Sequence, residues 1–165
     1  MKPVLVLCLG NEYLSDDGFG PAVAARLNTG SELPDYVEVL GAAVAGFNLL
    51  DHLAGRQRVL IVDTIRTGKS APGYLHYFSL GELAPTHHLT TSHQISLPTA
   101  LEFGRRLGLA MPAAVDVLAV EADDLETLRE YLTPPVAKAV EQAVLSIGTW
   151  ILENRVKEVP DNNGR

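Results

Sequence analysis

The most constraining feature of the sequence is a continuous apolar run, Val4–Leu9, which leads into a glycine-containing polar loop. A strand that is apolar at every position is buried on both faces, which is typical of the centre of a parallel sheet. The loop begins at Gly10 and ends at Gly20-Pro21, where the proline suits the first turn of a helix. Apolar residues then recur on one helical face, namely Phe19, Val23 and Leu27. The segment therefore predicts a strand, a loop and a helix in succession.

Strand-like runs and helical patterns alternate along the rest of the chain. The predicted strands are 37–40, 59–62, 115–120 and an antiparallel strand at 74–78, and the predicted helices are 47–53, 98–107 and a long helix from Pro134-Pro135. The long helix carries one apolar stripe, made of Val136, Val140, Val144, Ile147 and Ile151. This alternation predicts a single three-layer α/β domain over residues 1–156, with a mostly parallel twisted sheet of about five strands and helices on both faces. Residues 157–165 are polar and are expected to form a flexible tail.

Composition and charge exclude several classes of protein. Of the 165 residues, 47% are hydrophobic, which is enough for a substantial core. The formal net charge is −7, whereas a protein that binds nucleic acid or an anionic membrane needs a basic face. The single cysteine, Cys8, cannot form an internal disulfide or a cysteine-based metal cluster, and it favours a reducing compartment. Because the first apolar run is too short to span a membrane and no signal-peptide cleavage site follows it, we expect a soluble cytoplasmic protein without membrane insertion.

Carboxylates gather where loops leave the predicted strands, at the edge where open α/β sheets place their functional sites. Asp16 and Asp17 precede the first helix, and Asp63 follows the run 59–62. The first loop lacks the G-x-G-x-x-G spacing, and two acidic groups would repel a pyrophosphate, so a dinucleotide site is not expected. Helix capping accounts for one of the two neighbouring aspartates and leaves the other to face the cleft.

An imidazole in a later loop completes a candidate metal site. Asp17, Asp63 and His93 together supply two oxygen ligands and one nitrogen ligand, which can hold a divalent transition metal with open positions for substrate. Each residue also has a structural explanation, as a helix cap, a partner of loop amides or a surface histidine. Cys8 lies among apolar neighbours, and no G-x-S-x-G segment is present, so a serine or cysteine hydrolase is not expected.

The order of the motifs resembles a known family. Residues 10–20, with the pattern Gly-Asn-x-x-x-x-Asp-Asp-Gly-x-Gly, resemble the N-terminal signature of the hydrogenase maturation proteases. Segments 41–50, 59–64 and 91–98 resemble later segments of the same family, and the resemblance extends over roughly one domain. It implies an endopeptidase that trims the C-terminal tail of the large-subunit precursor of a nickel–iron hydrogenase.

The resemblance also assigns roles to individual residues. It places the family's two metal-contacting acids on Asp17 and Asp63 and its histidine on His93. These side chains would contact nickel that the precursor already holds, and we expect that zinc or another divalent metal would replace nickel in vitro. The attacking water is activated either by a metal or by Asp17 or Asp63 as a general base, and the sequence leaves both routes open.

The chain departs from the family pattern at two places. Many members have glutamate where Asp17 stands, and many carry a Gly-Ile-Gln-Pro-like segment where this chain has residues 120–124. Glu121 and Asp123 are therefore candidates for substrate choice, although a solvated acidic loop is the simpler interpretation. Two alternative functions share the expected fold: a non-proteolytic module that binds a metal or a nucleotide, such as a flavodoxin-like flavin protein, and a hydrogenase-assembly chaperone.

Overall fold

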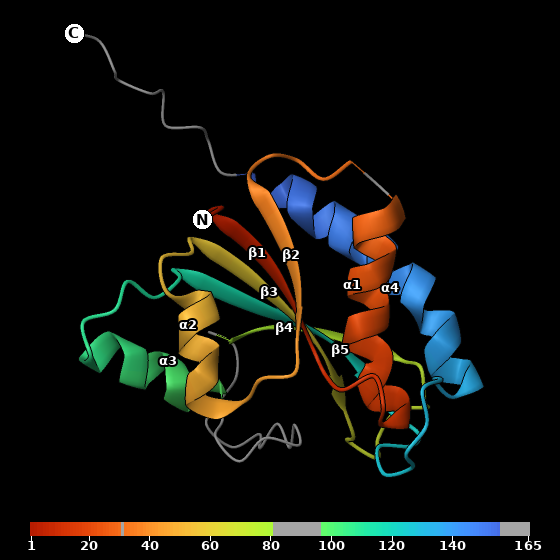
Figure 1. Cartoon of the computed structure of the whole chain (residues 1–165). Coiled ribbons are helices and arrows are strands. Elements are labelled where there is room, and N and C mark those ends of the chain that lie inside the picture. The colour runs from red at the N-terminus through yellow and green to blue at the C-terminus, as the bar shows by residue number, and fades with distance from the viewer. Residues whose placement is uncertain (31, 81–96, 156–165) are drawn as a thin grey trace, which may run out of the picture.

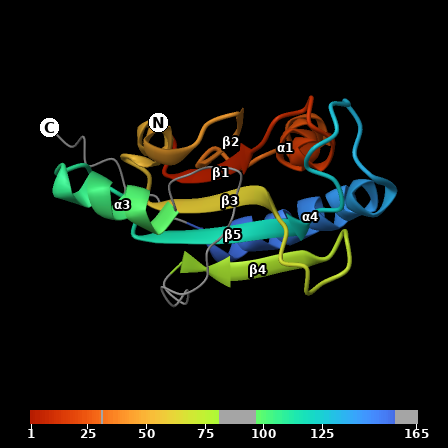
Figure 2. The same cartoon turned by 90° about the horizontal axis from the view of Figure 1, so that it is seen from below.

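A five-stranded sheet organises the chain, with the strands in the order β2-β1-β3-β5-β4. The computed structural model describes residues 1–30, 32–80 and 97–155. The parallel strands are β1 (Val4–Leu9), β2 (Val37–Ala42), β3 (Arg58–Ile65) and β5 (Ala114–Glu121). The edge strand β4 (Leu75–Ser79) runs antiparallel to β5, as predicted (Figure 2).

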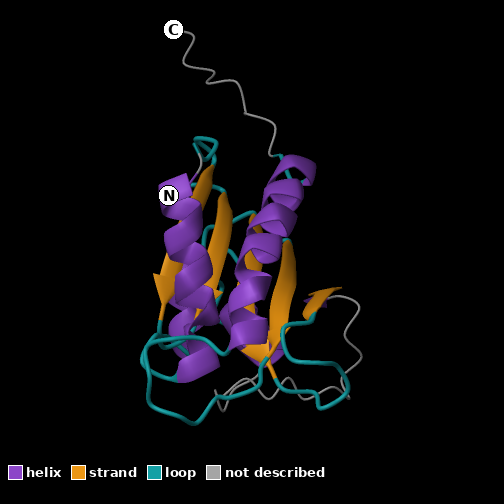
Figure 3. Cartoon of the chain, turned by 90° about the vertical axis from the view of Figure 1, so that its right-hand side faces the viewer, coloured by secondary structure: helices purple, strands orange, loops and turns teal. Residues whose placement is uncertain are grey.

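Helices cover both faces of the sheet, which confirms the three-layer prediction (Figure 1). A 3-10 turn, η1 (Ser15–Gly18), leads into α1 (Phe19–Gly30), and α1 lies beside α4 (Pro134–Glu153) on one face (Figure 3). The other face carries η2 (Gly46–Leu49), α2 (Leu50–Leu53) and α3 (Leu97–Arg106). No helix in the described part of the chain is long and apolar enough to span a membrane.

The core divides into two clusters because successive strand residues point to opposite faces. In β1 one set packs toward α1 and α4, namely Val4, Val6 and Cys8. The alternate set packs toward α2 and α3, namely Leu5, Leu7 and Leu9. All six β1 residues are buried, so the sequence prediction of a central strand is confirmed.

Two details differ from the sequence predictions. The strand predicted to end at Asp63 continues to Ile65, because the pairing of β3 with β5 continues through Asp63 and its neighbours. In α4 the valines at 140 and 144 are only partly buried. Small residues and a tryptophan complete its buried face instead, namely Ala139, Ala143 and Trp150. The predicted loop at 81–92 and the predicted tail at 157–165 lie outside the described residues.

Candidate functional site

Two glycines allow η1 to lie directly against the end of β1. A Cβ atom at Gly10, where φ is +139°, would lie 1.9 Å from the carbonyl oxygen of Asp17. A Cβ atom at Gly20 would lie 2.0 Å from the carbonyl oxygen of Leu9. No side chain fits at either position, so the glycine spacing in the loop is a requirement of this close approach. The turn thereby holds its two aspartates at the carboxyl edge of the sheet.

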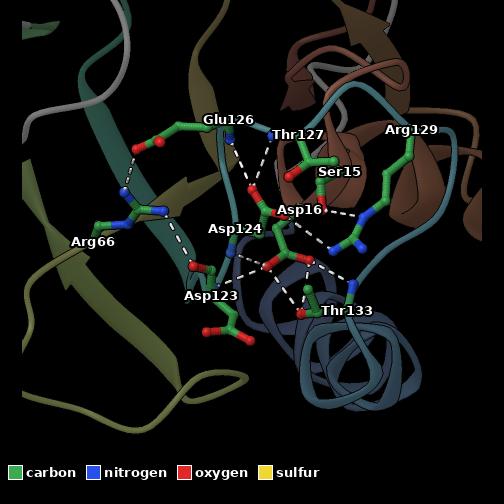
Figure 4. Close-up of polar contacts among 9 residues, drawn as sticks. All are labelled: Ser15, Asp16, Arg66, Asp123, Asp124, Glu126, Thr127, Arg129 and Thr133. Carbon is green, nitrogen blue, oxygen red and sulfur yellow. Dashed lines mark hydrogen bonds and ion pairs between the residues drawn. The ribbon is translucent and has the colours of Figure 1, made fainter.

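Asp16 is a structural residue that joins two loops (Figure 4). Its fully buried carboxylate accepts hydrogen bonds from the main-chain N–H groups of Asp123 and Asp124, both at 2.9 Å, and of Thr133 at 2.7 Å. The Thr133 hydroxyl lies 2.9 Å from both carboxylate oxygens. The capping explanation is therefore wrong for Asp16, because its partners lie in the distant loop between β5 and α4 and η1 has no side-chain cap.

Arg129 adds a second connection between the same two loops (Figure 4). Its guanidinium donates to the Ser15 hydroxyl at 3.0 Å and to the Asp124 carboxylate at 3.2 Å. Hydrogen bonds from Thr127 and from the main chain of Glu126 lower the pKa of Asp124 to about 2. Asp124 therefore remains ionised at all physiological pH values, and the charge-assisted contact with Arg129 persists.

Asp17 lies in the same turn but interacts differently. It is 5% exposed, and its Oδ2 atom accepts a hydrogen bond of 2.9 Å from the main-chain N–H of Asn11. This bond comes from the loop itself, so Asp17 does not cap a helix through it. Asp16 thus holds the two loops together, and Asp17 is the aspartate of the pair that is available for chemistry.

Asp63 lies within β3, where burial changes its acidity. It is 5% exposed, and its Oδ1 atom accepts a hydrogen bond of 2.7 Å from the N–H of Thr64. Three effects together raise the pKa of Asp63 to about 7. Burial is the largest and raises the pKa, the hydrogen bond from Thr64 lowers it, and the negative charge of Asp17 raises it. A carboxyl group that titrates near neutral pH can both accept and donate a proton, as a general acid–base group must.

The structure therefore brings Asp17 and Asp63 together, as the sequence predicts. The turn η1 contacts β3, and the two carboxylates influence each other electrostatically. His93 lies outside the described residues, so its place beside them remains a prediction. Within residues 1–30, 32–80 and 97–155 no group of three metal-ligating side chains is present. Two buried carboxylates that repel each other nevertheless suit a cation, since a positive charge would relieve both the repulsion and the cost of burial.

Glu121 is a buried residue at the end of β5, so its interpretation as part of a solvated loop is wrong. The residue is only 2% exposed. The carboxylate accepts hydrogen bonds from the N–H and the hydroxyl of Thr67, both at 2.8 Å. It also accepts hydrogen bonds from the Gly68 N–H at 3.0 Å and from Nε2 of His76 at 2.9 Å. Burial disfavours its ionised form, but these hydrogen bonds outweigh that effect and lower the pKa of Glu121. β5 is buried at every position from Val115 through Glu121, so the apolar run that leads directly into Glu121 is the sequence signal that could have revealed its burial. Asp123 is exposed, as expected for an acidic loop.

Comparisons with known proteins agree on one family. The family model described as hydrogenase maturation protease matches residues 21–150. The hydrogenase 2 maturation protease of Escherichia coli (strain K12) is 32% identical over 158 residues, which cover 95% of each protein. The solved structure of the hydrogenase maturating endopeptidase HybD from E. coli is similar with a TM-score of 0.79 and 32% identity, over 93% of each chain. The NiFe hydrogenase maturation protease HybD from Thermococcus kodakarensis gives a TM-score of 0.66 at 26% identity, over 91% of this chain and 99% of that one. This chain belongs to the hydrogenase maturation protease family.

Proposed function

We propose that this peptidase removes the C-terminal extension of a nickel–iron hydrogenase large-subunit precursor after nickel insertion. Its relatives in E. coli are named a hydrogenase 2 maturation protease and a hydrogenase maturating endopeptidase. The observation that carries the proposal is the pair of buried carboxylates, Asp17 and Asp63, at the carboxyl edge of the parallel sheet. In open α/β folds this edge is where ligands bind.

The nickel in this proposal arrives as part of the substrate. Asp17, Asp63 and His93 would contact it with two carboxylates and one imidazole. Nickel and zinc accept such a mixed oxygen and nitrogen donor set, whereas magnesium prefers oxygen ligands and retains its water. Contact with the metal would thus identify a precursor that is ready to be cut.

Asp63 is the proposed proton acceptor for the attacking water. Burial raises its pKa to about 7 in the metal-free protein, and contact with nickel would favour the ionised form that accepts a proton. The water oxygen would bond to the scissile carbonyl carbon while Asp63 takes the proton. Asp63 would then pass that proton to the departing amine as the carbon–nitrogen bond breaks.

The single cysteine supports a mechanism without a thiol nucleophile. Cys8 is free and fully buried in β1, and burial raises the pKa of its thiol to about 12. A thiol in this state supplies almost no thiolate at neutral pH. We further propose that the protein works in the cytoplasm, a reducing compartment that suits a chain with one unpaired cysteine.

The proposal is tested by incubating the protein with nickel-loaded precursor and measuring the precursor's mass. The wild-type protein is expected to remove the C-terminal extension. Asp17→Asn and His93→Ala are expected to leave the precursor intact while circular dichroism shows an unchanged fold. The control, Asp51→Asn, changes an exposed aspartate on α2 and should cut normally. Stable binding of the precursor without any loss of mass would instead identify a chaperone.

A further inference from the structure

A cavity lies at the amino edge of the parallel strands, opposite the edge that carries Asp17 and Asp63. Its volume is about 500 Å³, which is within the range of small-molecule sites. The space lies where β4 stops short, because β5 begins at Ala114 but its pairing with β4 reaches only to Asp116, opposite Ser79. Figure 2 shows the beginning of β5 between α3 and the end of β4, and residues of all three elements line the cavity.

The lining of this cavity combines two arginines with apolar side chains. Arg58 is the first residue of β3 and Arg105 lies in the last turn of α3, and both are exposed. The apolar part of the lining consists of Leu80, Pro98, Leu101, Pro112 and Val115. Ligand sites are typically built in this way, with apolar walls that hold the body of the ligand and a few polar groups that orient it.

Both arginines of the cavity lack a partner within the described part of the chain. Other arginines form ion pairs with carboxylates, namely Arg26, Arg56, Arg66, Arg106 and Arg129. Neither Arg58 nor Arg105 forms an ion pair or a side-chain hydrogen bond with any residue in 1–30, 32–80 and 97–155. The N–H donors of each guanidinium group therefore remain available to a ligand.

One carboxylate also lines the cavity, but it already has partners of its own. Asp116 accepts hydrogen bonds from the Ser79 hydroxyl and, at 2.8 Å, from Nε1 of Trp150 on α4. These bonds satisfy the Asp116 carboxylate without either arginine. Two arginines and one aspartate leave the lining with an excess of positive charge, in a chain whose formal net charge is −7. Such a local excess attracts an anionic ligand.

We propose that this cavity binds a small organic anion, with a carboxylate or phosphate group on Arg58 and Arg105 and an apolar body against Leu101 and Val115. Guanidinium groups bind both kinds of anion through paired N–H···O bonds, which are stronger than bonds between neutral groups. Five residues of strand separate Arg58 from Asp63, so the two ends of this stretch of β3 are roughly 17 Å apart. The anion site is therefore distinct from the carboxylate pair and does not depend on the proposed function.

Titrations with small anions, followed by proton–nitrogen NMR correlation spectra, test this proposal. The probes are benzoate and phenyl phosphate, which place one anionic group on a phenyl ring, and benzyl alcohol is the neutral probe of similar size. Arg58→Gln and Arg105→Gln each remove one guanidinium group, and because both side chains are exposed and unpaired, thermal unfolding should be unchanged. The matched control is Arg106→Gln, which removes the same charge from the next residue of α3, where Arg106 pairs with Glu102 and does not line the cavity.

The expected result is that an anionic probe shifts the amide signals of Ala114 and Val115, and the probe that binds more tightly identifies the preferred anion. Arg58→Gln and Arg105→Gln should each weaken its binding about tenfold, the effect of losing a hydrogen bond to a charged group, and Arg106→Gln should bind like the wild type.

Three results would overturn the anion site. The first is the absence of shifts at these amides with both anions, and the second is equally tight binding of benzyl alcohol. The third is wild-type affinity in Arg58→Gln or Arg105→Gln, or an equal loss of affinity in Arg106→Gln. Since no hydrogenase precursor enters the titrations, any of these results would leave the proposed function standing.

Discussion

Replacing Asp63 with asparagine is expected to stabilise the folded protein at neutral pH while abolishing peptidase activity. Burial raises the pKa of Asp63 from 3.8 to about 7, so the folded protein keeps this proton where the unfolded chain has released it. Between these two values the folded state binds more protons, and stability therefore falls as the pH rises through this range. Asparagine has a similar shape, can still accept the N–H of Thr64, and has no charge to bury.

The size of the effect follows from the change in pKa. The pKa of Asp63 rises from 3.8 to about 7 on folding, and one pKa unit corresponds to about 1.4 kcal/mol. At about pH 8, ionised Asp63 therefore destabilises the folded state by about 4 kcal/mol. The asparagine variant should gain most of this free energy of unfolding at about pH 8, and less than half of it at about pH 5. With a urea m-value of about 2 kcal/mol/M, the unfolding midpoint should rise by about 2 M at the higher pH.

Urea unfolding of the wild-type and Asp63→Asn proteins at both pH values measures this gain. Asp51→Asn, on the exposed side of α2, is the control and should leave the midpoint unchanged. An unchanged or lower midpoint for Asp63→Asn at about pH 8 would refute the reasoning. A gain of equal size at both pH values would also refute it, because the benefit would then not come from removing a buried charge.

Three further predictions concern the loops and the metal. Asp16→Ala should lower the free energy of unfolding by roughly 3 kcal/mol in urea titrations, because it leaves buried N–H groups unpaired. Gly20→Ala should prevent stable folding, because its Cβ atom would lie 2.0 Å from a carbonyl oxygen. Gly148→Ala in α4 has open space around the new Cβ atom and should stabilise the folded protein by about 1 kcal/mol. Thermal melts followed by circular dichroism compare the two variants. Nickel and zinc should raise the melting temperature of the wild-type protein more than magnesium does, and equal shifts in His93→Ala would place the binding elsewhere.

The strands of the sheet could be predicted because each shows its environment locally. Val4–Leu9 is apolar at every position and is buried on both faces, as a central parallel strand requires. The end of β3 could not be found in this way, because Asp63 and Thr64 are polar and only their pairing with β5 keeps them in the strand. Similarly, the partly buried Val140 and Val144 reflect how α4 packs against α1, which the apolar stripe alone does not determine.

The candidate site was predictable to the extent that topology determines it. Parallel strands bring their carboxyl ends to one edge, so the loop after β1 and the end of β3 were expected to bring Asp17 and Asp63 together. The partners of Asp16 and Glu121 could not be predicted, because they lie 107 and 45 residues away in the sequence, at Asp123 and His76. Such hydrogen bonds exist only once the strands have assembled, and a carboxylate that makes them has no distinctive local pattern.

The most direct test of the central claim is a comparison of two preparations of the same large-subunit precursor, one loaded with nickel and one without it. Intact-mass spectrometry follows each preparation during incubation with the wild-type protein. We predict that the nickel-loaded precursor loses the mass of its C-terminal extension and that the nickel-free precursor keeps its full mass. Cleavage of both preparations at equal rates would contradict recognition of nickel through Asp17, Asp63 and His93, and cleavage of neither would contradict the proposed peptidase function.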